Sequence, residues 1–235
     1  GKTWKLRFKN DDPKAFYDAM ACRGQQCFAV SDPVDGWFPI TGTHDGFSTW
    51  KTDYGWAVLP AVAGEAAFAA SGTCLIFAGG RYWFVTGGIR TSVYNFELHE
   101  DDELHSKRVD SPIPGGGAAS GIFSVAMFDS KKGVIVGGNY EKPDEHEKNL
   151  ALTTDGGATW KLGTGLSGYR SGVTYVDRKT IIAVGTNGSD ITRDGGKTWT
   201  VLGKENLNAV ASKGRRATWA VGPKGIVVKL KSGKE

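Results

Sequence analysis

Three acidic residues, Asp18, Asp32 and Glu65, are the side chains of this sequence whose type suits a reaction. Two carboxyl groups roughly 5 to 10 Å apart on either side of an open cleft can hydrolyse a glycosidic bond. That chemistry requires the fold to bring the carboxyl groups together at one surface. Asp32 also stands in S-D-P-V-D-G, which is typical of a well-capped turn, so a structural role competes with the catalytic one.

Arg170, Tyr140 and Asn187 suit recognition rather than reaction. The guanidinium group of Arg170 is a planar fork of donors that fits a carboxylate, and an ion pair with Glu65 is the structural alternative. Tyr140 opens the charged stretch Y-E-K-P-D-E-H-E-K-N, which ends at Asn149. Long loops of this kind carry binding more often than the elements they join. If these residues share one face, we expect a polar pocket without an activated nucleophile.

An eight-residue pattern recurs along the chain and indicates the elements that must position these residues. It reads T-T-D-G-G-A-T-W at 153–160, T-R-D-G-G-K-T-W at 192–199 and T-H-D-G-F-S-T-W at 43–50, and the chain opens on G-K-T-W. The aspartate can accept backbone N–H bonds across a tight turn, the glycines allow positive φ, and the tryptophan can pack between sheets. We expect a structural role, and no chemistry, for Asp45, Trp50, Asp155, Trp160, Asp194 and Trp199.

The spacing of the pattern predicts an all-β propeller of four-stranded blades. Periods of about 40 to 50 residues are typical of such blades. Pairs of strands joined by a turn can be aligned at 16–31, 66–86, 122–137, 171–185 and 207–222, which makes five blades in one domain, residues 1–235. The entry of each first strand and the exit of each second strand then meet on one face, opposite the repeated turns. This top face is predicted to collect Asp18, Asp32, Glu65, Tyr140, Arg170 and Asn187.

The two ends of the chain are predicted to close the ring. Gly225 to Leu230 leaves the fifth blade without its outer strand, and Gly1 to Phe8 is an outer strand without a blade, so we expect the two to pair. A ring closed in this way has no exposed sheet edge. The alternative is that the chain is part of a longer propeller, because it begins within the repeated pattern.

The repeated pattern resembles the Asp box, also called the BNR repeat, of sialidases and many other β-propellers. The segments D-P-K-A-F-Y-D-A-M, G-E-A-A-F-A-A-S-G-T-C, G-G-N-Y-E-K-P-D-E and A-V-G-T-N-G-S-D resemble an exported bacterial family related to the photosystem II stability and assembly factors. The resemblance covers nearly the whole chain. It implies a periplasmic or extracellular location after removal of a signal peptide. Members usually have seven blades, so a fragment of a seven-bladed propeller is the alternative fold.

Composition and short motifs argue against several classes of partner and cofactor. The net charge of +4 arises from 29 basic and 25 acidic residues dispersed along the chain, so no nucleic-acid partner is expected. No apolar run is long enough to span a membrane. No cofactor is expected, since there is neither a G-x-G-x-x-G after a strand nor a C-x-x-C. The acidic segment from Phe96 to His105 indicates a solvent-facing turn and not a metal site.

Cys22 and Cys27 should face each other across a hairpin, either bridged or as free thiols, and Cys74 should be buried.

We expect the protein to bind a protein or peptide partner through the top face, without a covalent step. The predicted ring of residues offers recognition groups but no activated nucleophile. A glycoside hydrolase of the sialidase or xyloglucanase type is the alternative, although a sialidase needs three converging arginines and this face offers only Arg170 and Arg90. An oxidoreductase is a second alternative, which rests only on a label carried by some members of the family.

Overall fold

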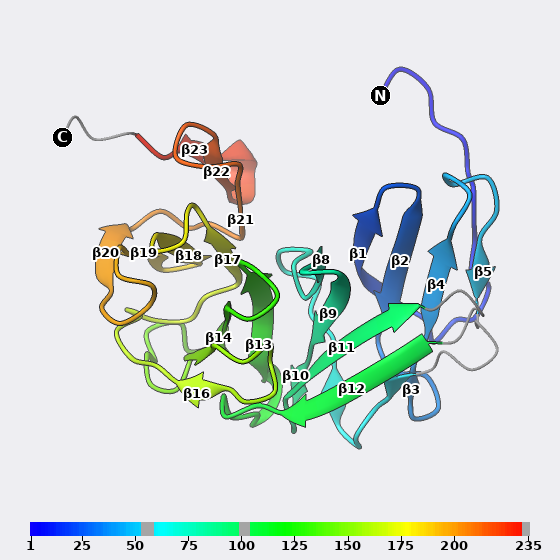
Figure 1. Ribbon diagram of the computed structural model, residues 1–235, viewed down its shortest axis with the longest axis horizontal. Helices are drawn as coiled ribbons and strands as arrows, with labels where there is room; N and C mark the ends of the chain where they lie inside the picture. Colours follow the sequence, from blue (N-terminus) through cyan, green and yellow to red (C-terminus); the bar gives the residue numbers. More distant parts are fainter. Residues whose placement is uncertain (53–58, 99–103, 232–235) are drawn as a thin grey trace.

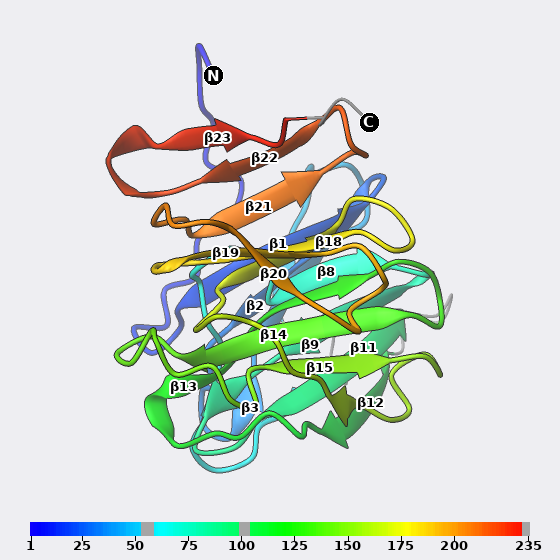
Figure 2. The ribbon, with the colours of Figure 1, turned by 90° about the vertical axis from the view of Figure 1, so that its left-hand side faces the viewer.

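The computed structural model describes residues 1–52, 59–98 and 104–231, and their backbone consists of short strands joined by turns. Five antiparallel sheets stand side by side in an arc (Figure 1). Figure 2 shows the sheets of blades 5, 4 and 3 one above another, from top to bottom. This is the five-bladed, all-β propeller arrangement that the spacing of the repeated pattern predicts.

Each blade is an antiparallel meander. Blade 1 contains β1 (Tyr17–Arg23), β2 (Gln26–Ser31), β4 (Ile40–Thr43) and β5 (Lys51–Thr52), and blade 2 contains β8 (Leu75–Ala78), β9 (Arg81–Val85), β11 (Ser92–Leu98) and β12 (Leu104–Asp110). Blade 3 contains β13 (Gly117–Met127), β14 (Gly133–Asn139), β15 (Leu150–Thr153) and β16 (Lys161–Leu162). Blade 4 contains β17 (Gly172–Tyr175), β18 (Ile181–Gly185), β19 (Gly188–Thr192) and β20 (Thr200–Gly203). Blade 5 has β21 (Ala209–Ser212), β22 (Thr218–Val221) and β23 (Val227–Lys229), with the 3₁₀ turn η1 (Pro223–Gly225) before β23.

Two short strand pairs depart from the predicted alignment. β7 (Glu65–Ala66) and β10 (Gly87–Gly88) extend the inner edge of blade 3, beside β13, while β3 (Trp37–Phe38) pairs with β6 (Leu59–Pro60). The predicted first strand of the second unit is therefore only partly right, because β8 begins at Leu75. Glu65 pairs instead with Gly88 and does not open the innermost strand of its blade.

Apolar side chains fill the space between neighbouring blades and hold the arc together. Aromatic rings dominate between blades 1 and 2, where Phe28 packs edge-on against Tyr82 (ring centroids 4.8 Å apart) and Phe38 packs edge-on against Phe84 (4.9 Å). Smaller aliphatic side chains form separate clusters between blades 3 and 4 and between blades 4 and 5. Burial of these side chains, at roughly 1.5 to 3 kcal/mol for each large one, is the main force that stacks the sheets.

Glycine is required where the second strands of blades 3 and 4 end. The backbone N–H of Arg170 donates to the carbonyl of Gly137 (3.0 Å), so the chain entering blade 4 crosses directly over the end of β14. A Cβ atom on Gly137 would overlap the carbonyl oxygen of Gly121. Likewise, a Cβ atom on Gly185 would overlap the carbonyl oxygen of Tyr169. These crossings bring the entry and exit segments together on the top face.

The repeated turns share one set of hydrogen bonds. The carboxylate of Asp155 accepts the backbone N–H of Thr159 (3.0 Å) and the hydroxyl groups of Thr159 (2.6 Å) and Thr153 (2.8 Å). The other two aspartates of the pattern accept the same three kinds of donor: Asp45 and Asp194. Each aspartate therefore satisfies its own turn at the end of the blade opposite the top face.

The tryptophans that end the pattern pack between sheets. Trp160 belongs to the apolar cluster that joins blades 1, 2 and 3, and Trp199 to the cluster that joins blades 3 and 4. The indole N–H of Trp199 also donates to the carbonyl of Gly196 within its own turn (3.2 Å). Trp50 is less covered and stacks with Phe8, with ring centroids 6.3 Å apart.

Replacing Asp155 or Asp194 by alanine is expected to lower the melting temperature at neutral pH and to flatten its fall in acid. Hydrogen bonds, chiefly from Thr159, lower the pKa of Asp155 to about 2, and bonds from Thr198 lower the pKa of Asp194. A carboxyl group whose pKa is lower in the folded state stabilises the fold above its unfolded pKa, near 4, and loses that contribution as the pH falls towards its folded pKa. Thermal unfolding followed by circular dichroism between about pH 7 and pH 2 measures both effects. Asp11→Ala, at an exposed site, is the control, and an equal acid slope in all variants would contradict the prediction.

The predicted pairing of the two chain ends is wrong. Among the described residues, Gly1 to Phe8 forms no strand and β23 pairs only with β22. Figure 1 shows the N-terminal segment beside blade 1, on the opposite arm of the arc from β23. Like charges that face each other across paired strands are unfavourable, and both segments are basic. Their basic residues are Lys2, Lys5 and Arg7 in one, and Lys224, Lys229 and Lys231 around the other.

The cysteines take one of the two arrangements that the sequence leaves open. Cys22 and Cys27 are opposite each other in the β1–β2 hairpin and form a disulfide. Cys74 is a buried free thiol, and burial raises its pKa to about 12. Because a protonated buried thiol is unreactive, Cys74 acts as a small apolar core residue.

Candidate functional site

A pocket of about 320 Å³ opens on the top face, where the entry and exit segments of blades 2 to 5 meet. Its lining residues are Phe68, Ala69 and Ala70 ahead of β8, Phe123 in β13, Tyr140 after β14, Tyr169 and Ser171 ahead of β17, Thr186 after β18, and Asn208 ahead of β21. None of these side chains carries a charge at neutral pH, since burial raises the pKa of Tyr169 further. The pocket therefore suits an uncharged group of a ligand.

Four aromatic rings form one wall of this top-face pocket. Phe68 stacks flat on Phe123, with ring centroids 3.9 Å apart and planes 8° apart. Phe123 also meets Tyr169 edge-on at 4.8 Å and Tyr140 edge-on at 6.1 Å. Tyr140 is 45% exposed, whereas Phe123 and Tyr169 are buried. A fixed aromatic wall with one exposed ring at its mouth can hold an apolar or aromatic group at little entropic cost.

The hydroxyl group of Thr186 differs from the other polar groups of this lining in its hydrogen bonding. Its oxygen is buried and makes no hydrogen bond with any described residue. A buried polar atom without a partner costs roughly 1 to 3 kcal/mol, and native proteins seldom leave one unexplained. By contrast, Ser171 in the same lining donates to the carbonyl of Asn208 (2.8 Å). Thr186 is thus a group that a bound ligand could satisfy.

Arg170 lies beneath the top face and is fully buried. It forms an ion pair with Asp190, with Nε and a terminal nitrogen 2.8 and 2.6 Å from the same carboxylate oxygen. Its remaining donors bind the carbonyl of Tyr169 (2.6 Å), the hydroxyl of Ser167 (2.6 Å) and the side-chain oxygen of Asn187 (2.8 Å). The alternative ion pair with Glu65 is not formed. A direct contact between Arg170 and a partner stays a prediction, and this geometry favours an indirect role.

Asn187 connects Arg170 to the loop from Tyr140 to Asn149. The Asn187 amide nitrogen donates to the carbonyl of Pro143 (2.7 Å) and to the carboxylate of Asp144 (3.0 Å). The backbone N–H of Tyr169 also donates to the Pro143 carbonyl (2.8 Å). Arg170 and Asn187 together therefore hold the base of the loop that carries Tyr140 at the mouth of the pocket.

Glu65 is buried in a separate polar cluster between blade 2 and the extension of blade 3. Its carboxylate accepts the backbone N–H of Val62 (2.7 Å), the hydroxyl of Thr86 (2.9 Å), the hydroxyl of Tyr94 (2.9 Å) and the hydroxyl of Ser92. Burial and the neighbouring Glu65 charge raise the pKa of Tyr94. With 5% exposure and these four donors, the Glu65 side chain has the surroundings of a structural hydrogen-bond acceptor.

Asp18 and Asp32 are neighbours at the start of blade 1. Burial, and secondarily the charge of Asp32, raises the pKa of Asp18 to about 7, and one of its carboxylate oxygens is buried without a hydrogen-bond partner. Asp32 accepts the backbone N–H of Ala67 (2.8 Å), and burial raises its pKa as well. The structure therefore brings two of the three predicted carboxyl groups together. Neither of them lines the top-face pocket, and Glu65 stands apart.

The sequence-based reasoning missed the aromatic wall and the unpaired threonine. Phe123 follows Ile122 and Thr186 precedes Asn187, so both are adjacent to positions that the repeat alignment places on the top face. The alignment therefore indicates both positions, although neither side chain is charged. Phe68 could not be found in that way, because its segment departs from the repeat.

The described residues contain neither a group of metal-ligating side chains nor a helix that could cross a membrane. Within them, no group of three or more His, Cys, Asp or Glu side chains could hold a metal ion. Part of the acidic segment between Phe96 and His105, residues 99–103, lies outside the described residues. No helix in the described part of the chain has the length and apolar character needed to cross a membrane.

Comparison with known proteins finds similarity in structure but not in sequence. No protein-family model matches the chain, and no curated protein matches it. Among solved structures, U3-55K superposes with a TM-score of 0.55 at 10% identity, covering 86% of this chain and 58% of that one. A Trypanosoma rangeli sialidase superposes with a TM-score of 0.51 at 13% identity, covering 88% of this chain and 43% of that one. YCF48 from Cyanidioschyzon merolae has a TM-score of 0.42 at 12% identity, over 91% of this chain and 81% of that one.

These similarities support the fold and no more. The chain spans well under two thirds of the U3-55K and sialidase structures. At 10 and 13% identity, a shared fold does not transfer an activity, because unrelated functions occur on the same propeller architecture. The comparisons therefore establish the β-propeller fold, which this chain shares with the U3-55K and sialidase structures.

Proposed function

We propose that this propeller is a non-catalytic binding module whose top-face pocket takes up an uncharged apolar or aromatic side chain of a protein partner. The observation that carries the proposal is the unpaired, buried Thr186 hydroxyl within a neutral pocket walled by Phe68, Phe123 and Tyr140. Such a pocket supplies apolar contact area and one orienting hydrogen bond, which is the usual composition of a recognition site. It contains no side chain that could serve as a nucleophile with an adjacent base.

The loop from Tyr140 to Asn149 adds charge to the rim of this pocket. It is mostly exposed and carries four acidic residues, Glu141, Asp144, Glu145 and Glu147, against two lysines, Lys142 and Lys148. Complementary rim charges chiefly speed association and select the partner. We therefore propose that the partner places a basic residue beside this loop when its apolar side chain enters the pocket.

Membership of the exported family related to photosystem II assembly factors, with Asp boxes as its repeated turns, is also part of the proposal. It is supported by the shared hydrogen bonds around Asp45, Asp155 and Asp194. The Cys22–Cys27 disulfide supports an extracytoplasmic location, because disulfides persist in oxidising compartments.

The first test is peptide selection followed by substitution in the pocket. A random displayed-peptide library is panned on the protein, and binding of the enriched peptides is measured by calorimetry. We expect each peptide to carry an apolar or aromatic residue, and Tyr140→Ala to weaken binding about tenfold through lost ring contact. Thr186→Val should weaken it by a similar factor while leaving the melting temperature unchanged or higher, because it removes an unsatisfied buried hydroxyl.

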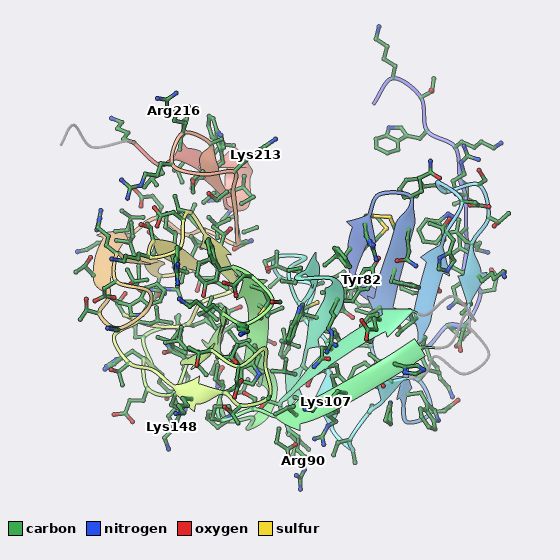
Figure 3. All side chains as sticks on the ribbon, viewed as in Figure 1. Tyr82, Arg90, Lys107, Lys148, Lys213 and Arg216 are labelled. Carbon is green, nitrogen blue, oxygen red and sulfur yellow. A yellow bond between two sulfur atoms is a disulfide. The ribbon has the colours of Figure 1, made fainter. Side chains whose placement is uncertain are left out.

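Arg90→Ala is the control, since Arg90 is exposed and outside the pocket lining. Its side chain points away from the blades (Figure 3). Peptides that bind equally well to the wild type, Tyr140→Ala and Thr186→Val would refute the proposed pocket.

A glycoside hydrolase is the second candidate, and the observation that favours it is the Asp18–Asp32 pair. An acid with a pKa of about 7 beside a second carboxyl group resembles a general acid and its partner. Against it, Asp18 is only 8% exposed. Turnover of aryl glycosides that Asp18→Asn abolishes would replace the binding function with this one.

A further inference from the structure

Basic side chains gather on the turns of blades 3, 4 and 5 at the end of the propeller opposite the top face. The inner turns, 128–132, 177–179 and 213–217, join the first two strands of each blade at this end. The repeated turns at 154–159 and 193–198 lie at the same end of blades 3 and 4. Together these turns contain nine basic residues, which we call the basic face: Lys131, Lys132, Arg178, Lys179, Arg193, Lys197, Lys213, Arg215 and Arg216.

Capping aspartates shape the inner turns of blades 3 and 4 in the same way. The carboxylate of Asp129 accepts the backbone N–H groups of Lys131 (2.8 Å) and Lys132 (2.7 Å). The carboxylate of Asp177 likewise accepts the backbone N–H of Lys179 (2.9 Å). Because each aspartate closes its own turn, the lysine side chains are left at the surface, with Lys131 and Lys179 exposed and Lys132 half-buried.

Backbone hydrogen bonds fix the outer turn of each blade against its inner turn. The N–H of Gly156 donates to the carbonyl of Lys131 (2.9 Å), and the N–H of Gly195 donates to the carbonyl of Lys179 (2.8 Å). Both bonds join a repeated turn to the inner turn of the same blade. The basic side chains of the two kinds of turn are therefore held side by side.

Contacts between blades join the turns into one surface. Nε of Arg215 in blade 5 lies 3.0 Å from the carboxylate of Asp177 in blade 4. The ring of Phe128 in blade 3 packs against Tyr175 in blade 4, with centroids 5.5 Å apart. Phe128 is also 41% exposed, so one aromatic ring is accessible among the basic residues.

The basic face holds the positive charge that the composition leaves dispersed along the sequence. Against the nine basic residues, the same turns contain four acidic ones: Asp129, Asp155, Asp177 and Asp194. This excess of nine over four is larger than the net charge of +4 of the whole chain, so the remainder of the chain is close to neutral. The fold therefore gives the protein one strongly basic side.

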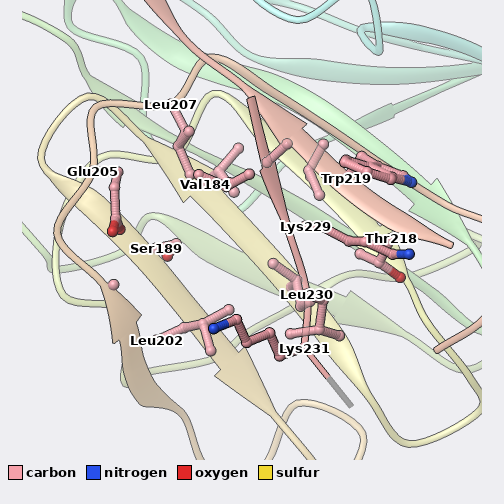
Figure 4. Close-up of a pocket in the computed structure, with 15 residues that line it drawn as sticks. Val184, Ser189, Leu202, Glu205, Leu207, Thr218, Trp219, Lys229, Leu230 and Lys231 are labelled. Carbon is pink, nitrogen blue, oxygen red and sulfur yellow. The ribbon is translucent and has the colours of Figure 1, made fainter. Parts of the chain in front are cut away.

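We propose that the basic face is a contact surface for a bilayer rich in anionic phospholipid. Such a bilayer attracts clustered Lys and Arg side chains, and an exposed aromatic ring among them can enter the headgroup region. None of the nine residues lines the top-face pocket or the apolar pocket of about 270 Å³ between blades 4 and 5 (Figure 4). Lys213 and Arg216 instead project outward from blade 5 (Figure 3). The inference does not rest on the top-face pocket, which would point away from the membrane and stay accessible.

A nucleic acid is a poorer occupant of the basic face. Proteins hold single strands on successive aromatic rings that stack with the bases. The five turns contain one aromatic residue, Phe128. Direct readout of a duplex uses a helix or a two-stranded ribbon in the major groove, and these short turns supply neither.

The test is cosedimentation of the protein with vesicles of phosphatidylcholine, alone or mixed with phosphatidylglycerol. We expect binding to the anionic vesicles only, and weaker binding as salt is raised. Lys131→Gln with Lys179→Gln should weaken that binding about thirtyfold, because each basic residue near an anionic surface contributes a factor of about five. Arg90→Gln with Lys204→Gln is the matched control, since it removes the same charge from exposed sites at the top ends of blades 2 and 4 and should bind like the wild type.

Both double variants should melt at the wild-type temperature, because all four side chains are exposed. Equal binding to neutral and anionic vesicles, or an equal loss of binding in the two double variants, would overturn the proposal. So would a duplex oligonucleotide or polyglutamate that binds more tightly than the anionic vesicles at the same salt and loses that binding in Lys131→Gln with Lys179→Gln. The basic face would then belong to a nucleic acid or to an acidic protein segment.

Discussion

Arg170→Ala is expected to destabilise the fold by about 3 to 5 kcal/mol, because it leaves the carboxylate of Asp190 buried without its counter-charge. Both side chains are fully buried, and the arginine also binds Tyr169, Ser167 and Asn187. The cost of breaking such a pair is the cost of an uncompensated buried charge rather than the value of the pair itself. Urea unfolding followed by tryptophan fluorescence measures the change.

Two variants distinguish this explanation from a general loss of packing. Arg90→Ala removes an exposed arginine and should change stability by less than about 0.5 kcal/mol. Replacing both partners by apolar residues, Arg170→Met with Asp190→Leu, should recover much of the loss, because no charge then remains unpaired. An Arg170→Ala protein as stable as the wild type would show that the guanidinium is not buried as described. Such a protein with weakened peptide binding would instead support direct contact with the partner.

Gly137→Ala is expected to cost about 3 kcal/mol, at the upper end of the range for overpacking. The added Cβ atom would overlap the carbonyl oxygen of Gly121, which is backbone and cannot rotate away. Relief would require the end of β14 to move from the start of β13, where the two strands are paired. Because Arg170 N–H bonds to the Gly137 carbonyl, the entry to blade 4 would shift with it. The midpoint of urea unfolding is the measurement.

Gly116→Ala is the matched control for this substitution. The nearest atom to its added Cβ would be the Ser120 hydroxyl oxygen at 3.6 Å, which is ordinary contact. A small effect at Gly116 and a large one at Gly137 would show that close backbone approach, and not the general preference of a turn for glycine, fixes these positions. Equal effects at both sites would contradict the explanation.

The architecture could be predicted from the sequence because its repeated turns depend on residues that are neighbours in the chain. The turn residues around Asp45, Asp155 and Asp194 each need only their own neighbours to form the turn, so their spacing alone indicates blades. The hairpin pairing of Cys22 with Cys27 is similarly local. Gly137 and Gly185 occupy the same place in two blades, so the alignment predicts a glycine there. The close backbone contact that requires this glycine is evident only in the structure.

The candidate site could be predicted only in part, because burial and long-range partners decide what a polar residue does. The repeat alignment predicts Arg170 and Glu65 as charged residues on one face, yet each is buried with its own set of partners. Those partners, such as Asp190 and Tyr94, lie 20 and 29 residues away from them in sequence.

Only the tertiary structure could show which groups remain unsatisfied. The pocket at Thr186 is defined by rings from four separate segments, Phe68, Phe123, Tyr140 and Tyr169. Sequence determines which turns and strands this chain can form, since those depend on neighbouring residues. Which of its polar groups are satisfied within the fold and which remain available to a partner depends on contacts between blades, and the folded arrangement alone decides them.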